Sequence, residues 1–265
     1  MHAHVLSTER LTPSLVRVVL GGDGLRDFAM PATTDTYVNL AFPPAGAPYA
    51  APFSPAEVRE TQPRELWPAR RRYTVRAWDD VARELTLDFV VHGDAGVAGP
   101  WAASAAPGDV LVLEGPSGGY RPDPEAGWHL MVGDESAVPA IAASLEAVPA
   151  GVPAVVRLLC DGPDHEVPLT CAGPLDLAWL HRTGDDDSEA LVASLRDLTL
   201  PAGEVHAFVH GEAEEVRAVR RHLLGERGLA RRSMSCSPYW RRHMTDEAWR
   251  EVKRDFVASM DADVA

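Results

Sequence analysis

The first half of the chain alternates short apolar runs with turn residues. In one run Leu85, Leu87 and Phe89 alternate with Thr86 and Asp88, which is the period of a half-buried strand. Similar runs rich in β-branched or aromatic residues lead us to expect strands at 16–20, 37–42, 72–78, 85–91 and 110–113. The N-terminal residues add a strand-like pattern that charges interrupt. No long helical pattern separates these runs, so the first half predicts a small antiparallel barrel.

A proline-rich stretch interrupts this pattern between residues 43 and 68, where seven of 26 residues are proline. Proline lacks an N–H group and fixes φ, so neither a central strand nor a regular helix is expected there. We expect a long surface loop with at most one turn of helix.

Strands and helices alternate in the second half of the chain. Strands are expected at 128–132, 152–160 and 205–209, with shorter ones near 177–181 and 232–236, and helices at 136–148, 188–198, 214–226 and 245–260. Pro139 falls in a first helical turn, where its missing N–H is harmless, and Ser188 and Thr245 are N-cap candidates. Such alternation is typical of a parallel sheet with crossover helices.

A turn-rich segment at residues 115–127 separates the two patterns. We therefore predict an α+β protein of two domains. Residues 1–120 are expected to form an N-terminal antiparallel β-barrel, and residues 121–265 a C-terminal α/β domain with a parallel sheet.

The charge of the chain restricts its partners. There are 39 acidic and 25 basic residues, and the formal net charge is −14. Nucleic acid and anionic membrane surfaces are therefore not expected partners. No run of 18 apolar residues indicates a transmembrane helix, and the N-terminus lacks the pattern of a secretory signal. We expect a cytoplasmic protein without stable membrane association.

The cysteines do not indicate a metal site. Cys160, Cys171 and Cys236 are widely spaced, and no Cys-x-x-Cys pair occurs. This argues against structural zinc and against an iron–sulfur cluster, and an odd number gives no disulfide framework.

One basic cluster departs from the acidic background. Arg231, Arg232, Arg241 and Arg242 lie within twelve residues of one another. Such a cluster is expected to attract an anion.

The chemistry-bearing motif of the first half is Arg71-Arg72-Tyr73-Thr74. On a strand Arg71 and Tyr73 share one face, while Arg72 and Thr74 share the other. An arginine offers a rigid fork of donors to a phosphate, a tyrosine offers a flat ring, and a threonine hydroxyl can hydrogen-bond a heteroaromatic nitrogen. These parts can hold a flavin and its diphosphate. A basic edge strand with an aromatic cross-strand contact explains the same residues.

Arg-x-Tyr-Thr on a barrel strand resembles the FAD-binding motif of the ferredoxin-reductase-like superfamily. The segment 88–102, DFVVHGDAGVAGPWA, narrows the resemblance to the stretch with which siderophore-interacting proteins hold the flavin. Val97 and Pro100 depart from the pattern usual in that family. The resemblance implies cofactor contacts from Asp88, Val90, His92, Ala98 and Trp101, the last of which could instead pack on the core.

The second half carries three further matches. The segment 133–137, Gly-Asp-Glu-Ser-Ala, resembles the family's GDETA and lies where a strand meets a helix, a natural place for a dinucleotide. The acidic pair Asp134 and Glu135 suits the nicotinamide or ribose end better than the phosphates. The resemblance implies that Gly133, Asp134, Glu135 and Ser136 contact this cofactor.

His210-Gly211-Glu212 is similar to the family's AGE motif, and residues 238–243 are similar to its GYWRrG motif. Pro238 and His243 stand where that family usually has glycine. The resemblance implies that Gly211, Glu212, Tyr239 and Trp240 contact flavin or nicotinamide. It also implies that Arg241 and Arg242 attract a 2′-phosphate or the anionic groups of a siderophore.

The five matches follow the family's order along most of the chain, which therefore resembles FAD-dependent ferric-siderophore reductases. The resemblance implies that NAD(P)H passes a hydride to FAD near Thr74, the expected catalytic side chain. Electrons then pass singly to iron(III) in a ferric siderophore, and iron(II) is released without a protein general base.

Two other functions remain open from the sequence. One is a flavin reductase of the same fold that serves ferredoxin or free flavin, and the other is a siderophore-binding protein without turnover. NADH, NADPH and reduced ferredoxin remain open as electron donors. Asp161 hints at a ribose contact, while Arg182 and Arg241 hint at a phosphate contact.

Overall fold

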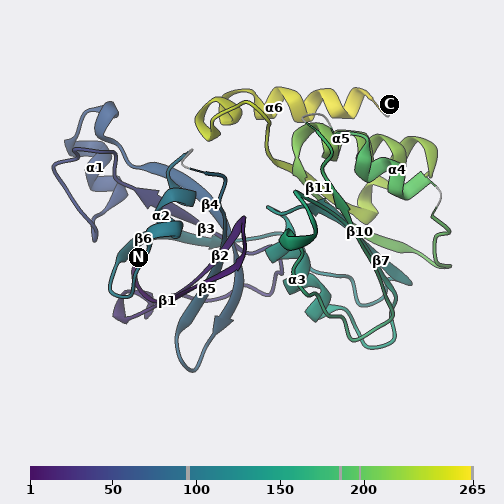
Figure 1. The fold of residues 1–265 in the computed structure, drawn as a ribbon, viewed down its shortest axis with the longest axis horizontal. Helices are drawn as coiled ribbons and strands as arrows, with labels where there is room; N and C mark the ends of the chain where they lie inside the picture. Colours follow the sequence, from purple (N-terminus) through teal and green to yellow (C-terminus); the bar gives the residue numbers. More distant parts are fainter. Residues whose placement is uncertain (94–95, 185–186, 197, 264–265) are drawn as a thin grey trace. The chain divides into compact units, whose positions relative to one another are not determined.

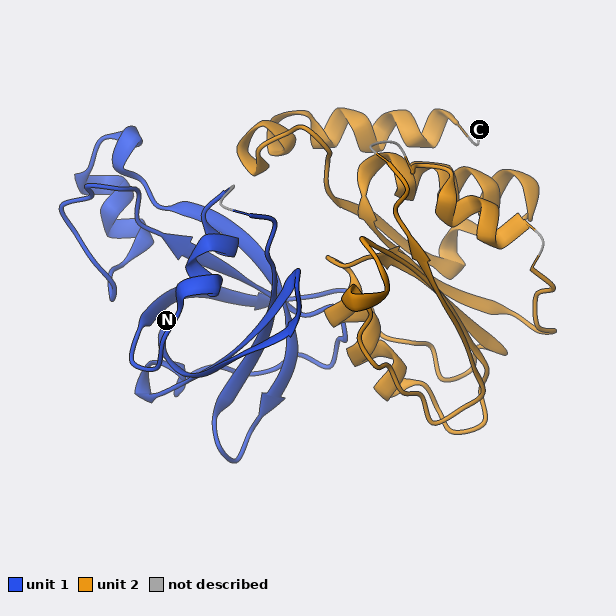
Figure 2. Cartoon of the chain, in the orientation of Figure 1, with its two compact units in different colours: residues 1–119 blue, residues 120–265 orange. Residues whose placement is uncertain are grey.

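The computed structural model describes residues 1–93, 96–184, 187–196 and 198–263. The chain forms two compact units, 1–119 and 120–265, which Figure 2 colours separately. Each unit has its own sheet and its own buried core. Among the described residues, no helix combines the length and the apolar character that crossing a membrane requires.

The first unit is a closed barrel in which every neighbouring pair of strands is antiparallel (Figure 1). The strands are β1 (His2–Thr12), β2 (Leu15–Gly21), β3 (Tyr37–Phe42), β4 (Ala69–Asp79), β5 (Glu84–Val90) and β6 (Val110–Ser117), in the order β1-β2-β5-β4-β3-β6. Side chains such as Val18, Leu40 and Leu87 fill the interior and are fully buried. The predicted antiparallel barrel is confirmed.

Strand β1 closes the barrel by pairing with β2 and β6. It was not among the five predicted strands. Ala3 and Val5 point into the core, but residues 6–10 are all exposed. Because an exposed edge of this kind needs no apolar alternation, the sequence pattern gave only a broken signal.

The proline-rich stretch contains a regular helix, α1 (Pro55–Thr61). The expectation of at most one helical turn is wrong, because Pro55 is the first residue of the helix, where its missing N–H leaves no bond unmade. The Ser54 hydroxyl caps the helix by accepting the Glu57 N–H at 3.3 Å. A second short helix, α2 (Ala98–Ser104), follows β5.

The second unit is a parallel five-stranded sheet among the described residues, with the order β11-β10-β7-β8-β9. Its strands are β7 (Trp128–Asp134), β8 (Ala154–Cys160), β9 (Leu175–His181), β10 (Val205–Glu212) and β11 (Met234–Trp240). The predicted parallel sheet is confirmed. The chain runs outward from β7 to β9 and then crosses to β10, so the order reverses between β7 and β10. Ligands of open α/β sheets bind outside the carboxyl ends of the strands at such a point.

Helices cover both faces of this sheet (Figure 1). They are α3 (Val138–Ala147), α4 (Ala190–Arg196), α5 (Ala213–Arg221) and α6 (Asp246–Ala262). Leu130 and Val132 of β7 belong to the core with α4, α5 and α6. Met131 points the other way and packs with Ile141 of α3. Both faces of β7 are therefore apolar, which is why its sequence reads as a continuous apolar run.

Two of the boundaries that differ from the sequence prediction have a clear physical cause. Helix α3 begins at Val138 rather than Ser136, because the Asp134 side chain binds both the N–H and the hydroxyl of Ser136. Strand β11 continues through Pro238 to Trp240. A proline is tolerated there because β11 is an edge strand, paired with β10 alone, and its register shifts beside Gly211.

A histidine lies inside the second unit. His129 of β7 is fully buried, and its ring centroid lies 6.2 Å from that of His206. Burial, together with nearby His206, lowers the pKa of His129 from 6.5 to about 4, although Asp123 opposes the shift. The folded state therefore keeps this imidazole neutral where an unfolded chain would protonate it.

We predict that His129 makes the fold sensitive to acid. The pKa of His129 is lower in the folded chain than in the unfolded chain. Its contribution to the free energy of unfolding is therefore fully present above pH 6.5 and is lost as the pH falls toward 4. The loss from this one group is about 3 kcal/mol. The His129→Leu variant should lose correspondingly less stability than the wild type between pH 7.5 and 4.5, as measured by urea unfolding followed by tryptophan fluorescence.

Comparison of variant with wild type at each pH is essential, because burial raises the pKa of Glu135 to about 7 and that of Glu215 to about 8, which acts in the opposite direction. The control is His181→Leu, an exposed histidine at the end of β9. Equal acid sensitivity of wild type and His129→Leu would contradict the prediction.

Candidate functional site

Strand β4 carries the predicted flavin-binding motif, and its register fixes where each side chain points. Arg71 lies opposite Leu40 and Tyr73 opposite Val38, two fully buried residues of β3. Directly opposite residues share a face, so Arg71 and Tyr73 are on the interior face of the barrel. Thr74 lies opposite Tyr37 on the other face. The structure therefore brings Arg71 and Tyr73 to one face and Thr74 to the other.

One edge of β4 makes both faces reachable. Strand β3 pairs with β4 from Ala69 to Thr74, whereas β5 pairs with β4 only from Val75 onward. Along Ala69–Thr74, no described strand pairs with β4 on the β5 side. A ligand lying along that edge can meet side chains from both faces at once. The donor set there, a guanidinium, a phenol ring and a hydroxyl, suits a diphosphate and a heteroaromatic ring, and so it fits FAD.

Aromatic packing fixes the Tyr73 ring. Its centroid lies 4.3 Å from that of Phe89, and Phe89 lies 5.5 Å from Trp101. Trp101 also packs against Phe42 at 5.8 Å. Trp101 is partly buried and packs against the barrel core, and its contact with a cofactor stays a prediction.

The rest of the segment 88–102 divides between core and loop. Asp88 is buried, and its two carboxylate oxygens accept hydrogen bonds of 2.7 and 2.8 Å from Arg17. Because Arg17 already neutralises it, we no longer assign Asp88 a cofactor contact. Val90 ends β5, His92 is exposed in the following loop, and Ala98 is buried at the start of α2.

Four further positions of this segment lie in the loop or at the start of α2. Asp94 and Ala95 lie outside the described residues. Val97 immediately precedes α2, and Pro100 falls in its first turn, where proline leaves no backbone bond unmade.

In the second unit, the Asp134 carboxylate joins three strand ends. One oxygen accepts the N–H and the hydroxyl of Ser136 at 2.8 and 2.5 Å. The other accepts the Glu212 N–H from the end of β10 and the Trp240 indole N–H from the end of β11, both at 2.8 Å. Asp134 is fully buried, and a carboxylate has about four acceptor positions. All of them are taken, so Asp134 positions its neighbours rather than contacting a cofactor.

Two glycines permit this arrangement. Gly211 has φ +144°, and a Cβ there would lie 3.0 Å from the Asp134 carboxylate carbon. A Cβ at Gly133 would clash with the His210 carbonyl oxygen and approach the Ala137 Cβ to 2.6 Å. Both positions lie at the point where the strand order reverses, and glycine keeps the backbones of β7 and β10 close there.

Glu212 caps α5 and holds the segment after β11. One carboxylate oxygen accepts the N–H groups of Glu214 and Glu215 at 2.7 and 3.2 Å. The other accepts the Arg242 N–H at 3.0 Å. The neighbouring side chain of Glu215 is also buried and binds the Arg242 guanidinium. Burial raises the pKa of Glu215 to about 8, against the effect of Arg182 and Arg242.

The basic cluster predicted as an anion site is largely neutralised. Arg231 pairs with Asp261 at 2.6 Å, Arg241 with Glu214 at 2.9 Å, and Arg242 with Glu215. Arg241 also lies over the Phe256 ring, 5.0 Å from its centroid. The chain thus supplies carboxylates for three of the four arginines, and the expectation that the cluster attracts an anion stays a prediction. Arg241 keeps a side chain that is 32% exposed.

Tyr239 lies on the other face of this edge, 4.9 Å from the His210 ring. Its carbonyl oxygen accepts the Trp249 indole N–H from α6 at 3.1 Å. Tyr239 and Trp240 are thus held by two different elements, although they are adjacent in the sequence.

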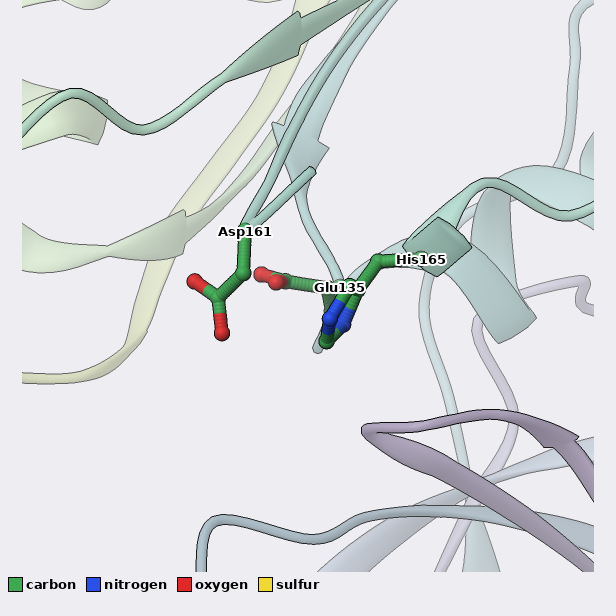
Figure 3. Close-up of side chains that lie close together, drawn as sticks. All are labelled: Glu135, Asp161 and His165. Atoms are coloured by element: carbon green, nitrogen blue, oxygen red, sulfur yellow. The ribbon is translucent and has the colours of Figure 1, made fainter. Parts of the chain in front are cut away.

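A second charged group lies after β7, β8 and β9. The carboxylate oxygens and ring nitrogens of Glu135, Asp161 and His165 lie within 4.8 Å of one another (Figure 3). Arg182 donates to both oxygens of Glu135, at 2.7 and 2.8 Å, and to Asp161 at 2.9 Å. Burial raises the pKa of Glu135 to about 7 although Arg182 opposes it. Because the guanidinium already occupies these carboxylates, we do not assign a metal ion there.

Sequence reasoning missed several residues that organise these sites. Arg17, Glu215 and Trp249 were not singled out, and Arg182 was considered only as a phosphate contact. Their partners lie between 10 and 71 positions away, so no local motif contains both members of a pair. One feature of the sequence could have indicated these pairs: an acidic residue within a strand or helix whose pattern is otherwise that of a buried element, such as Asp88 or Glu215.

Comparisons with known proteins agree with this layout. The model of the siderophore-interacting FAD-binding domain matches residues 4–120, and that of the siderophore-interacting protein matches residues 126–243. The ferric vibriobactin reductase of Vibrio cholerae is 34% identical, over 92% of this chain and 90% of its own. The NADPH-dependent ferric-chelate reductase of Escherichia coli is 31% identical, over 89% and 91%.

A solved structure gives the same result for the fold. The crystal structure of the siderophore-interacting protein SipS from Aeromonas hydrophila superposes with a TM-score of 0.81 at 27% identity, covering 97% of this chain and 98% of that one. The chain belongs to the siderophore-interacting protein family, a family of FAD-binding reductases with the ferredoxin-reductase-like fold.

Proposed function

We propose that this protein is an FAD-dependent reductase that passes electrons from NAD(P)H to iron(III) held in a siderophore. The observation that carries the proposal is the motif on β4, where Arg71, Tyr73 and Thr74 flank the edge that β5 leaves uncovered. Membership of a family whose relatives include ferric-siderophore and ferric-chelate reductases supports it. Bound FAD would supply the chemistry by accepting a hydride from the nicotinamide and passing single electrons to the iron.

On this proposal the first unit holds the flavin. Arg71 donates to the diphosphate, and Tyr73 presents a ring whose plane is fixed by Phe89. The Thr74 hydroxyl lies on the other face of the strand and is the side chain we assign to the reactive edge of the ring system. We keep Val90, His92 and Ala98 as proposed cofactor contacts through the loop between β5 and α2.

The second unit would bind the nicotinamide coenzyme at the reversal between β7 and β10. Gly133 and Gly211 keep the ends of β7 and β10 close together there, and we retain both as proposed coenzyme contacts through their backbone. Tyr239 and Trp240 are the proposed aromatic contacts. Trp240 is held through its indole N–H by Asp134, so its orientation is set before any ligand binds.

The arginines after β11 take different roles. Arg242 is held on buried Glu215 and positions the chain. Arg241 is more exposed, and we propose it as a contact for the carboxylates or catecholates of a ferric siderophore. Release of iron(II) would follow, because siderophores hold it much more weakly than iron(III). We propose that this reaction takes place in the cytoplasm.

The whole proposal is tested by anaerobic assay of the purified chain after incubation with FAD. We expect a yellow protein whose flavin absorbance is bleached by NADH or NADPH and restored by a ferric siderophore, with iron(II) captured by a coloured chelator. Restoration by ferredoxin or free flavin but not by ferric siderophore would favour another reductase of the same fold. A protein that binds ferric siderophore but takes up no FAD would be a carrier.

We predict that Arg71→Ala weakens FAD binding by at least about tenfold, because charge-assisted hydrogen bonds to a phosphate contribute roughly 1.5–3 kcal/mol. The measurement is titration of the apoprotein with FAD, followed by quenching of flavin fluorescence. The matched control is Arg72→Ala, whose guanidinium lies 5.5 Å from the Tyr37 ring on the opposite face. Equal losses in the two variants would contradict the assignment of Arg71.

We predict that Asp134→Asn separates nicotinamide-driven reduction from FAD binding. An amide nitrogen cannot accept an N–H group, so either the Ser136 N–H or the N–H groups of Glu212 and Trp240 lose their acceptor, at a cost of about 1–3 kcal/mol for each buried donor. We expect a lower urea midpoint and slower bleaching by nicotinamide, with the FAD dissociation constant unchanged.

The control for Asp134 is Ser136→Ala, which removes only the hydroxyl donor, keeps the backbone N–H of residue 136 and leaves the bonds to Glu212 and Trp240 intact. It should bleach at close to the wild-type rate. If Ser136→Ala and Asp134→Asn slow the reaction equally, the positioning of Trp240 by Asp134 is not what matters.

A further inference from the structure

The order of the parallel sheet identifies the position that faces the adenosine ribose. In chain order, the five strands of the parallel sheet are β7, β8, β9, β10 and β11, so β8 is the second strand. In dinucleotide-binding sheets of this order, an acidic side chain near the end of the second strand binds the ribose hydroxyls of NAD, whereas an arginine there accommodates the 2′-phosphate of NADP. Here β8 ends at Cys160, and the next residue is Asp161.

The nearby arginine is already occupied. Arg182 follows β9 and donates to Glu135 at 2.7 Å and to Asp161 at 2.9 Å. The Arg182 side chain is only 15% exposed and that of Glu135 only 6%. All of these bonds come from Nη1, whereas Nη2 is buried and has no hydrogen-bond partner among the described residues. A phosphate that took Nη1 would leave a buried carboxylate without its partner, which is strongly unfavourable.

The loop that begins at Asp161 is acidic in its composition. Residues 161–174 contain three acidic residues, Asp161, Asp164 and Glu166, and no lysine or arginine. A 2′-phosphate carries between one and two negative charges near neutral pH and would be repelled there. Two ribose hydroxyls carry no charge and can donate to a carboxylate.

The arginines that follow β11 lie too far from the end of β8 to bind a 2′-phosphate there. Arg241 and Arg242 follow β11, which is separated from β8 by β10 and β7. Three strand spacings amount to about 14 Å. Both guanidinium groups are also paired with glutamates of α5.

We propose that this protein selects NADH over NADPH, with Asp161 as the residue that determines the choice. The inference rests on the proposed function, since it concerns the donor of that reaction. In this preference the chain would differ from its relative in Escherichia coli, whose name specifies NADPH.

The kinetic test compares the two coenzymes on the FAD-loaded full chain. We expect kcat/KM for flavin reduction to be at least about tenfold higher with NADH than with NADPH. Asp161→Asn should reduce that ratio by about fivefold or more, because it removes the charge facing the 2′-phosphate and loosens the hold on Arg182. The matched control is Asp164→Asn, an exposed aspartate three residues further on, which should change the ratio by less than about twofold.

A binding test needs no flavin. Calorimetric titration of the full chain with adenosine 5′-monophosphate and with adenosine 2′,5′-bisphosphate should give the tighter dissociation constant for the former. In Asp161→Asn this difference should shrink, while in Asp164→Asn it should persist. Thermal unfolding of each variant confirms that the second unit is intact.

The outcomes distinguish a failure of the coenzyme preference from a failure of the proposed function. Equal or preferred use of NADPH by the wild type overturns the inference and leaves the proposed function standing. An unchanged ratio in Asp161→Asn overturns the assignment of that residue. If neither coenzyme bleaches the flavin and neither nucleotide binds, the nicotinamide donor of the proposed function is wrong, and the inference fails with it.

Discussion

A carboxylate removed from water is stable only when hydrogen bonds replace the solvent it has lost. Asp134 meets this condition with donors from three separate segments, and the carboxyl edge of the parallel sheet depends on them. Its bond to Glu212 fixes the end of β10, and Glu212 in turn caps α5 and holds Arg242. Its bond to Trp240 fixes the end of β11. The aromatic and basic segment that the family motif marks is therefore positioned from within the sheet.

The charged residues of this edge are mostly committed to one another. Arg242 neutralises Glu215, Arg241 meets Glu214, and Arg182 bridges Glu135 and Asp161. Such pairs add little net stability when buried, but they fix the geometry of the groups they join. The edge is accordingly a preorganised surface rather than a basic pocket, and a ligand binds to groups whose positions are already determined.

Local sequence patterns predicted the strands and helices better than they predicted which side chains pair with one another. Period-two alternation identified the barrel strands whose two faces differ, but it missed β1, where residues 6–10 are exposed on both faces. Proline content suggested too little structure in residues 43–68, because it does not reveal that Pro55 occupies the first position of a helix. The motifs located Asp88, Asp134 and Arg242, yet their roles depend on Arg17, Trp240 and Glu215, which lie far along the chain. No short window contains both partners, so only the fold could show that these groups are already paired.

The separation of those partners also bears on how the second unit folds. The bonds from Asp134 to Glu212 and Trp240 span 78 and 106 residues. Closing chain segments of that length costs entropy before the contacts are made, and long-range parallel pairing is slow for this reason. The strand ends can meet at Asp134 only after β7, β10 and β11 have taken their places. The hydrogen bonds at the carboxyl edge therefore close long loops of the second unit, and they can form only once all three strands are in place.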